Sequence, residues 1–153
     1  MIKSYEINKE TIAIIPIDKK TSKVFEFNNS FFVKDSVMNI IDNSCRYFGS
    51  SYHGRFEGTK SMLNISYKNP IIIEESREII FFPTASPRAD DCNWISLENI
   101  EKYEKDDFNT LVLFKNGQSL SFNISYLSFE NQIYRASRLL LVLKNKKIEI
   151  NRP

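Results

Sequence analysis

The densest group of residues suited to binding chemistry is a glycine-rich segment near the middle of the chain. Three of the four glycines lie between Gly49 and Gly58, inside the run 44–59, which also holds two arginines, one histidine and four aromatic residues. Small residues let backbone amides approach an anion closely, and arginine side chains can hold that anion in place. The segment therefore suits contact with phosphate or with a DNA groove. A helix C-cap followed by a tight turn with aromatic core residues explains the same composition equally well.

Common catalytic and metal-binding patterns are missing from the sequence. No Gly-x-Ser-x-Gly elbow, phosphate-binding P-loop or dinucleotide-binding glycine pattern occurs. One histidine and two distant cysteines, Cys45 and Cys92, do not make a structural zinc site. We expect no enzyme, no cofactor and no metal site. A pair of carboxylates brought together by the fold is the one catalytic arrangement left open.

Length and composition favour one cytoplasmic domain. The 153 residues are enough for a real core, and 42% of them are hydrophobic. Neither a membrane-length apolar run nor a signal peptide is evident, and two well-separated cysteines suit a reducing compartment. We therefore expect a single domain over residues 1–153.

The charge distribution is more informative than the net charge of +2. Segments 46–70 and 131–153 are basic, and the intervening segment 71–100 is acidic. Two basic segments could form one nucleic-acid-binding face, although a solvated surface of mixed sign is the simpler explanation.

Strand patterns dominate the predicted elements. Apolar or alternating stretches predict strands at 11–17, 24–27, 62–67, 71–74 and 78–82. Residues 83–91 are predicted to form a loop, after which ordered structure resumes at 94–96. Pro16 should lie at an edge or at the end of its strand. Asn116-Gly117 predicts a hairpin between strands 110–114 and 119–124.

Two amphipathic helices complete the pattern. Asp35-Ser36 offers an N-cap for a helix over 36–48, which Gly49 would end, and a second helix is expected over 126–143. Leu139, Leu141 and Val142 give the second helix more apolar surface than one core-facing stripe needs. A subunit interface and burial on both sides within a monomer both explain this surplus. The fold class predicted is α+β, mostly antiparallel, with two main helices.

Several colinear motifs resemble the family of the competence transcription factor ComK. The longest is SCRYFGSSYHGR at 44–55, with Gly58-Thr59 after it. KNPI at 68–71, FFPT at 81–84 and CNWIS at 92–96 follow in order. The resemblance continues through Asn116-Gly117, ISY at 124–126 and SFENQIYR at 128–135, and so covers nearly the whole chain.

This resemblance implies a cytoplasmic bacterial activator that switches on DNA-uptake genes. Such proteins bind paired A/T-rich boxes, reportedly through the minor groove, as dimers that assemble into tetramers, and RNA polymerase is a further expected partner. Minor-groove readout depends on groove width and deformability, which suits a loop with arginines better than a recognition helix. A short paralogue that modulates a full-length partner is the alternative function.

The resemblance also bears on turnover. Longer members of the family continue with a tail that helps the adaptor MecA to deliver ComK to a Clp protease. This sequence ends at Asn151-Arg152-Pro153, so the resemblance does not imply adaptor-driven degradation for this chain. A trimmed chain and a natural short form both fit.

Matching the motif positions gives a set of candidate DNA contacts. The first group is Arg46, Ser50, Ser51, Tyr52, His53 and Arg55, and Lys60 and Lys68 are expected to clamp phosphates. Arg88, in the proline-flanked loop, is an additional groove probe, and Arg135 and Arg138 form a second tier. Arg46 also has a purely structural alternative, which is an ion pair with Asp42 one turn earlier on its helix.

Overall fold

A computed structural model describes residues 1–151 of the chain. Arg152, which contributes to the basic C-terminal segment, and Pro153 lie outside the described residues. The elements, in order, are β1 (Thr11–Asp18), β2 (Thr21–Glu26), β3 (Ser30–Val33), α1 (Val37–Tyr47), α2 (Tyr52–Leu63), β4 (Ile71–Glu74), β5 (Ile79–Pro83), β6 (Trp94–Ser96), β7 (Ile100–Asp106), β8 (Asn109–Phe114), β9 (Ser119–Phe122) and α3 (Tyr126–Ile150).

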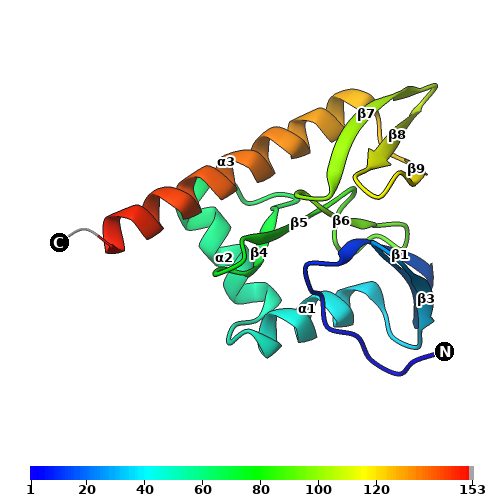
Figure 1. Ribbon diagram of the computed structural model, residues 1–153, viewed down its shortest axis with the longest axis horizontal. Helices are drawn as coiled ribbons and strands as arrows, with labels where there is room; N and C mark the ends of the chain where they lie inside the picture. Colours follow the sequence, from blue (N-terminus) through cyan, green and yellow to red (C-terminus); the bar gives the residue numbers. More distant parts are fainter. Residues whose placement is uncertain (152–153) are drawn as a thin grey trace.

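Two antiparallel sheets form the β structure. The larger sheet has the strand order β3-β2-β1-β6-β5-β4, and the smaller has the order β7-β8-β9. Figure 1 shows α3 running along one side of the molecule past both sheets, with α1 on the opposite side and α2 beside β4. The predicted α+β class and antiparallel pairing are confirmed.

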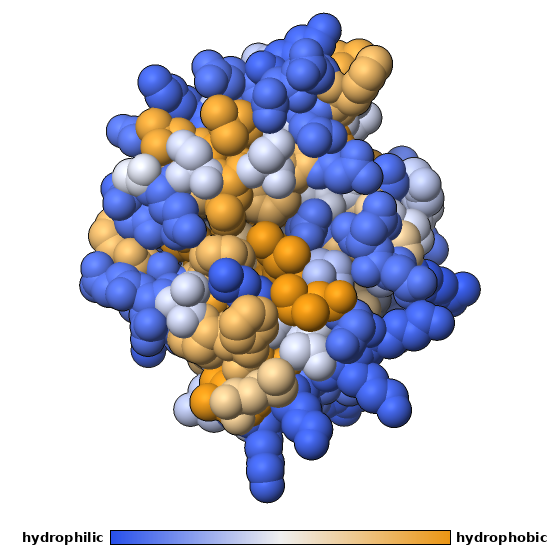
Figure 2. All heavy atoms as spheres, turned by 90° about the vertical axis from the view of Figure 1, so that its right-hand side faces the viewer, coloured by the Kyte–Doolittle hydropathy of each residue, from blue (hydrophilic) through white to orange (hydrophobic). Residues whose placement is uncertain are grey.

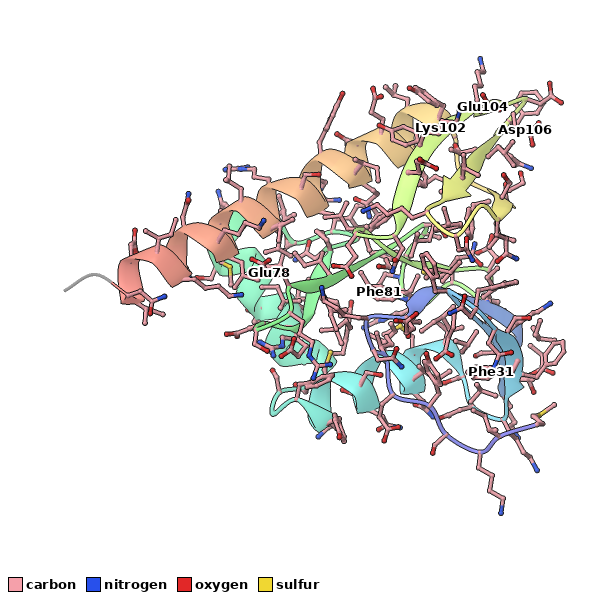
Figure 3. All side chains as sticks on the ribbon, viewed as in Figure 1. Phe31, Glu78, Phe81, Lys102, Glu104 and Asp106 are labelled. Atoms are coloured by element: carbon pink, nitrogen blue, oxygen red, sulfur yellow. The ribbon has the colours of Figure 1, made fainter. Side chains whose placement is uncertain are left out.

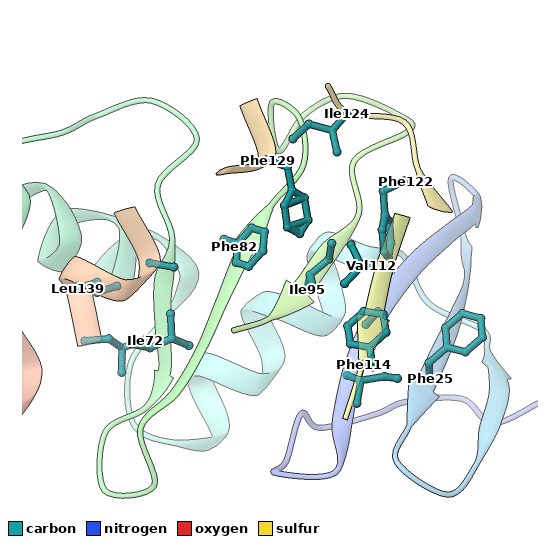
Figure 4. Packing of buried hydrophobic residues seen from close by; sticks show 14 of the residues in the cluster. Phe25, Ile72, Phe82, Ile95, Val112, Phe114, Phe122, Ile124, Phe129 and Leu139 are labelled. Carbon is teal, nitrogen blue, oxygen red and sulfur yellow. The ribbon is translucent and has the colours of Figure 1, made fainter. Parts of the chain in front are cut away.

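The large sheet is buried on both faces, and its side chains alternate between two core clusters. Along β5, Ile80 and Phe82 join the cluster that contains the small sheet and α3, whereas Ile79 and Phe81 join the cluster that contains α1. Successive residues of a strand point to opposite faces, so a continuous apolar run fills both clusters. Figure 4 shows the first cluster, in which Phe82 meets Phe129 of α3 edge to face with ring centroids 5.5 Å apart.

Several local predictions are confirmed. The Ser36 hydroxyl caps α1 by accepting the Asn39 N–H, and the Asn116-Gly117 hairpin joins β8 to β9 with Gly117 at φ +89°. Pro16 lies in the part of β1 that pairs only with β2, because β6 covers only Ala13 and Ile14. Pro16 thus lies where one side of β1 has no partner strand, as the sequence predicts.

The main correction concerns residues 49–63. The sequence predicts a glycine-rich loop there and a strand over 62–67, but α2 occupies Tyr52–Leu63 and leaves only four residues, 48–51, between α1 and α2. Ser51 caps this helix, and Thr59 and Leu63 bury one side of it. The Thr59 hydroxyl donates to the carbonyl of Pro70 at 2.6 Å. These tertiary contacts outweigh the low helix propensity of the two glycines inside α2.

Two further differences concern the edges of elements. Helix α3 continues to Ile150 and not to residue 143, and strand β7 has no counterpart in the prediction. Five of the seven residues of β7 are charged, which is typical of a protected edge strand and hides the apolar alternation.

Large apolar side chains are exposed at several places on the surface, Phe108 and Leu127 among them. Figure 2 shows apolar residues gathered in the middle of the face formed by the strands, with hydrophilic residues around them. No helix within residues 1–151 has the length and apolar composition that a membrane span requires.

Candidate functional site

A groove of about 850 Å³ opens where α1 and α2 begin. Its walls come from the end of β1, the first turns of both helices, and the loops at 66–68 and 86–92. Trp94 and Tyr52 line it from the core side, with ring centroids 6.0 Å apart in an edge-to-face arrangement. Burial of Tyr52 against this cluster raises the pKa of its phenol. The aromatic residues at the start of α2 are thus part of the fold as well as part of the groove wall.

Four of the predicted contact residues come together at this groove. Tyr52 and His53 lie in the first turn of α2, Lys68 in the loop that follows that helix, and Arg88 in the loop before β6. His53 and Arg88 are exposed, and Lys68 is half-buried with its Nζ 5.2 Å from the centre of the Tyr67 ring. Three segments that are distant in sequence therefore present basic or polar groups to one opening.

The groove also includes a cation that the sequence prediction missed. Lys19, in the turn between β1 and β2, lines the groove, and so do two carboxylates, Asp18 and Asp90. Nothing local marks Lys19, because its place in the groove depends on how the large sheet packs against the helices. The salt bridges found among residues 1–151 include neither Lys19, Lys68 nor Arg88.

The junction between α1 and α2 is organised by Asp42. Its carboxylate accepts a hydrogen bond from Arg46 Nε and another from the backbone N–H of Tyr52, both at 2.9 Å. The Arg46 hydrogen bond, followed by the Tyr52 N–H, lowers the pKa of Asp42. Arg46 therefore makes the structural ion pair that was its alternative role.

Three residues hold the short turn before α2. Gly49 has a φ of +88° and donates to the carbonyl of Arg46, while Ser50 donates to that of Cys45, which together make a Schellman C-cap. The Ser51 hydroxyl accepts the Gly54 N–H at 2.9 Å. The C-cap prediction for Gly49 is thus confirmed, and Ser51 has a capping role.

Arg55 is turned away from solvent. Only 15% of its side chain is exposed, and its Nη1 lies 2.8 Å from Glu75 Oε1 at the β4–β5 turn. Its Nε is buried with no hydrogen-bond partner among the described residues. In this conformation Arg55 links α2 to β4 and is poorly placed to reach a ligand.

The remaining candidates lie outside the groove. Lys60 is exposed on α2, seven residues and about two turns beyond His53 on the same side of the helix. Arg135 is half-buried on α3, donates to the carbonyls of Tyr67 and Lys68, and has a pKa lowered by burial. Arg138 is exposed on α3.

Metal-ligating and thiol side chains are dispersed in the part of the chain that the structure describes. No group of three or more His, Cys, Asp or Glu side chains converges within residues 1–151, and both cysteines are buried free thiols. The groove offers an aromatic wall, cations that have no ion-pair partner among residues 1–151, and the N-terminal end of a helix, which favours negative charge.

Comparison with known proteins agrees with this description. The family model described as ComK protein matches residues 2–148. The chain is 44% identical over 142 residues to a competence transcription factor of Bacillus subtilis (strain 168), an alignment that covers 90% of this chain and 74% of that protein. No solved structure matches the chain.

Proposed function

The chain belongs to the ComK family, and from this premise we propose that it is a sequence-selective, DNA-binding activator of competence genes. The family match also supports the expectation that the chain is not an enzyme. We propose that residues 1–153 act as one cytoplasmic DNA-binding domain on paired A/T-rich boxes, through the minor groove, as a dimer or tetramer that works with RNA polymerase.

The observation that carries the DNA-binding proposal is the set of unpaired cations around the groove. Lys19, Lys68 and Arg88 face one opening, and Lys60 lies on the exposed side of the adjoining helix. Cations without carboxylate partners are free to neutralise phosphates and to release the counterions condensed on DNA.

Specific roles follow from their positions. We assign the minor-groove contact to Arg88, because an exposed arginine on a short proline-flanked loop can enter a narrow A/T-rich groove. Lys19, Lys60 and Lys68 are assigned to phosphates, with His53 beside them and Tyr52, Ser50 and Ser51 shaping the start of α2. Arg46, Arg55 and Arg135 become structural residues in this assignment.

The first test is a titration of duplexes with and without paired A/T-rich boxes, at two salt concentrations. We expect tighter binding to the paired boxes, weaker binding to every duplex at higher salt, and competition by a minor-groove ligand. Equal affinity for both duplexes would refute sequence selectivity. If the minor-groove ligand does not reduce binding, the contact lies in the major groove, which the exposed side of α2 could enter.

The second test compares two exposed arginines. Arg88→Ala should weaken binding to A/T-rich boxes by about 1–3 kcal/mol and relax the A/T preference. Arg77→Ala is the matched control, because Arg77 is exposed in the β4–β5 turn and does not line the groove. Lys60→Ala should instead weaken binding to all duplexes alike. It should also reduce the slope of log affinity against log salt concentration by about one. Equal effects of the Arg88 and Arg77 substitutions would refute the assignment.

The alternative function is a protein-interaction module that modulates a longer relative. The exposed apolar residues of α3 favour it, because they are suited to contact with another protein. A chain that binds such a relative but never shifts DNA by itself would support this alternative.

A further inference from the structure

Helix α3 exposes a row of large apolar side chains at constant spacing. Leu127, Tyr134, Leu141 and Ile148 follow at intervals of seven residues and are 76%, 62%, 59% and 61% exposed. Seven residues make nearly two helical turns, so the four side chains project in one row, the α3 stripe. The buried residues of α3, centred on Ala136, occupy the opposite side of the helix.

The fold of the single chain does not account for this row. The three extra apolar residues predicted for this helix differ in burial. Leu139 is fully buried, Val142 is half-buried and Leu141 is exposed. Single exposed apolar residues are ordinary, but a row running nearly the length of a helix is typical of a packing surface. The groove lies elsewhere, since its lining residues come from segments between 16 and 94.

We propose that the α3 stripe packs antiparallel against the α3 stripe of a second copy of this chain. Because the intervals are equal, each side chain of the row meets a side chain of the same row on a second, reversed helix. A two-fold interface requires this self-complementarity. Leu127 then faces Ile148 of the second copy, and Tyr134 faces Leu141. Seven-residue spacing also suits the packing of two long helices side by side.

Charges favour this partner and this direction. The last turns of α3 carry Lys144, Lys146 and Lys147 against Glu149, whereas Glu130 is the one charged residue of its first two turns. Lys144 and Lys147 also approach Glu78 of the same chain, at 3.9 and 3.6 Å, so Lys146 is the lysine of this end with no salt-bridge partner among residues 1–151. Beside that start runs β7, which is joined to α3 by the Tyr103 hydroxyl at 3.3 Å from Glu130 Oε2. Segment 101–107 carries four carboxylates and two lysines, and Figure 3 shows three of these charged residues along β7. Antiparallel copies bring basic ends beside acidic ends, whereas parallel copies would bring like charges together.

The centre of the interface gives a role to Arg138. This residue lies between Tyr134 and Leu141 on the exposed side of α3. In the antiparallel pair its guanidinium lies over the Tyr134 ring of the second copy, where a cation–π contact is favourable. Arg138 is then a self-association residue and not a DNA contact.

The stripe is small, so the association it supports is weak. Four side chains are far fewer than the roughly 20–30 residues that each partner contributes to a standard stable interface. Two copies held on neighbouring boxes of one duplex have a high local concentration and pair readily. This last consequence rests on the proposed function, whereas the pairing of free chains does not.

Sedimentation velocity of the full chain over a range of concentrations tests the surface without DNA. The wild-type chain should shift from its monomer mass of 17.9 kDa towards twice that value as concentration rises. Leu141→Glu should weaken the association at least about tenfold, because it buries an unpaired carboxylate. Ser128→Glu is the charge-matched control: it adds the same group to an exposed position of α3 outside the stripe, three residues after the Ser125 N-cap, where glutamate is well tolerated. Equal association of all three proteins would overturn the proposal.

Cysteine cross-linking tests the orientation. A chain with both Tyr134→Cys and Leu141→Cys should form disulfide-linked dimers under mild oxidation, and a chain with Leu141→Cys alone should not. In the antiparallel pair the two copies of position 141 lie about 10 Å apart along the axis, which is too far for a disulfide. The native Cys45 and Cys92 are buried and do not compete. Efficient linking by Leu141→Cys alone would show parallel packing and overturn the orientation.

Binding to duplexes with one or two boxes separates this proposal from the proposed function. Leu141→Glu should bind one box like the wild-type chain and lose cooperativity on two boxes. Retained cooperativity would overturn the role of the stripe on DNA. Failure of every protein to bind DNA would refute the proposed function and leave the sedimentation result to decide the interface.

Discussion

At the scale of single residues, charge type alone does not identify a contact. Arg46 and Arg55 are the most suggestive cations of the glycine-rich segment, yet both have carboxylate partners, Asp42 and Glu75, at 2.9 and 2.8 Å. Arg88 and Lys68 have no such partner among the described residues. The unpaired cations, and not those closest to the glycines, are therefore the better candidates for DNA contact.

Replacing Arg55 by alanine should lower stability more than DNA affinity. Because the Glu75 carboxylate is exposed, its ion pair with Arg55 contributes about 1 kcal/mol or less to stability. The buried aliphatic part of Arg55 adds packing to this. Urea unfolding should show a total loss of about 1–2 kcal/mol, and a cycle with Glu75→Gln isolates the ion pair. A loss of DNA affinity on the order of 1–3 kcal/mol at unchanged stability would show instead that Arg55 contacts DNA.

At the scale of elements, the glycine cluster serves two different structures. Gly49 ends α1 with a positive φ, whereas Gly58 lies inside α2 in an ordinary helical conformation. A Cβ at Gly58 would meet nothing closer than Met62 Cε at 3.9 Å, so the helix does not require glycine there. The cluster that looks like one flexible loop is a short turn followed by a helix.

Alanine substitutions at these two glycines should have opposite effects. Gly49→Ala should cost about 1–2 kcal/mol, because a side chain disfavours the left-handed conformation. Gly58→Ala should gain about 0.5–1 kcal/mol from helix propensity. Thermal or urea unfolding of both variants measures these changes in the free energy of unfolding. Destabilisation by Gly58→Ala would contradict the α2 helix described for residues 52–63.

At the scale of the whole molecule, the large sheet separates two cores. One contains α3 and the small sheet, and the other contains α1, Trp94 and both cysteines. Cys45 lies on α1 and Cys92 just before β6, so two distant segments meet in the second core. Thiol reactivity therefore reports on the integrity of that core.

Both thiols should resist alkylation until the protein unfolds. Burial raises the pKa of Cys45 to about 12 and that of Cys92 to about 11, above the usual thiol value of about 8.5. The stability that the protonated thiols contribute is fully present below about pH 8.5 and is lost as the pH rises through the folded values. Alkylation followed by mass spectrometry, with and without urea, checks this. Rapid labelling of folded protein would contradict the burial.

Much of the fold follows from local patterns. The apolar run of β5, the N-cap of α1 and the Asn116-Gly117 hairpin each depend on neighbouring residues, and all three are confirmed. Helix α2 is different, because its two glycines disfavour a helix and the contacts that compensate, such as Thr59 with Pro70, come from outside it. Strand β7 was missed because charged residues interrupt its apolar alternation.

The sequence by itself determined the family, the α+β class, most strand positions and the region around α2 as the candidate site, because these depend on residue order and short-range pattern. The tertiary structure decided which cations stay unpaired, since ion pairs such as that of Arg55 with Glu75 join segments twenty residues apart. It also brought Lys19 and Arg88 to the lining of one groove and left the α3 stripe outside the core. Such long-range proximity depends on how sheets and helices pack, which no local pattern records.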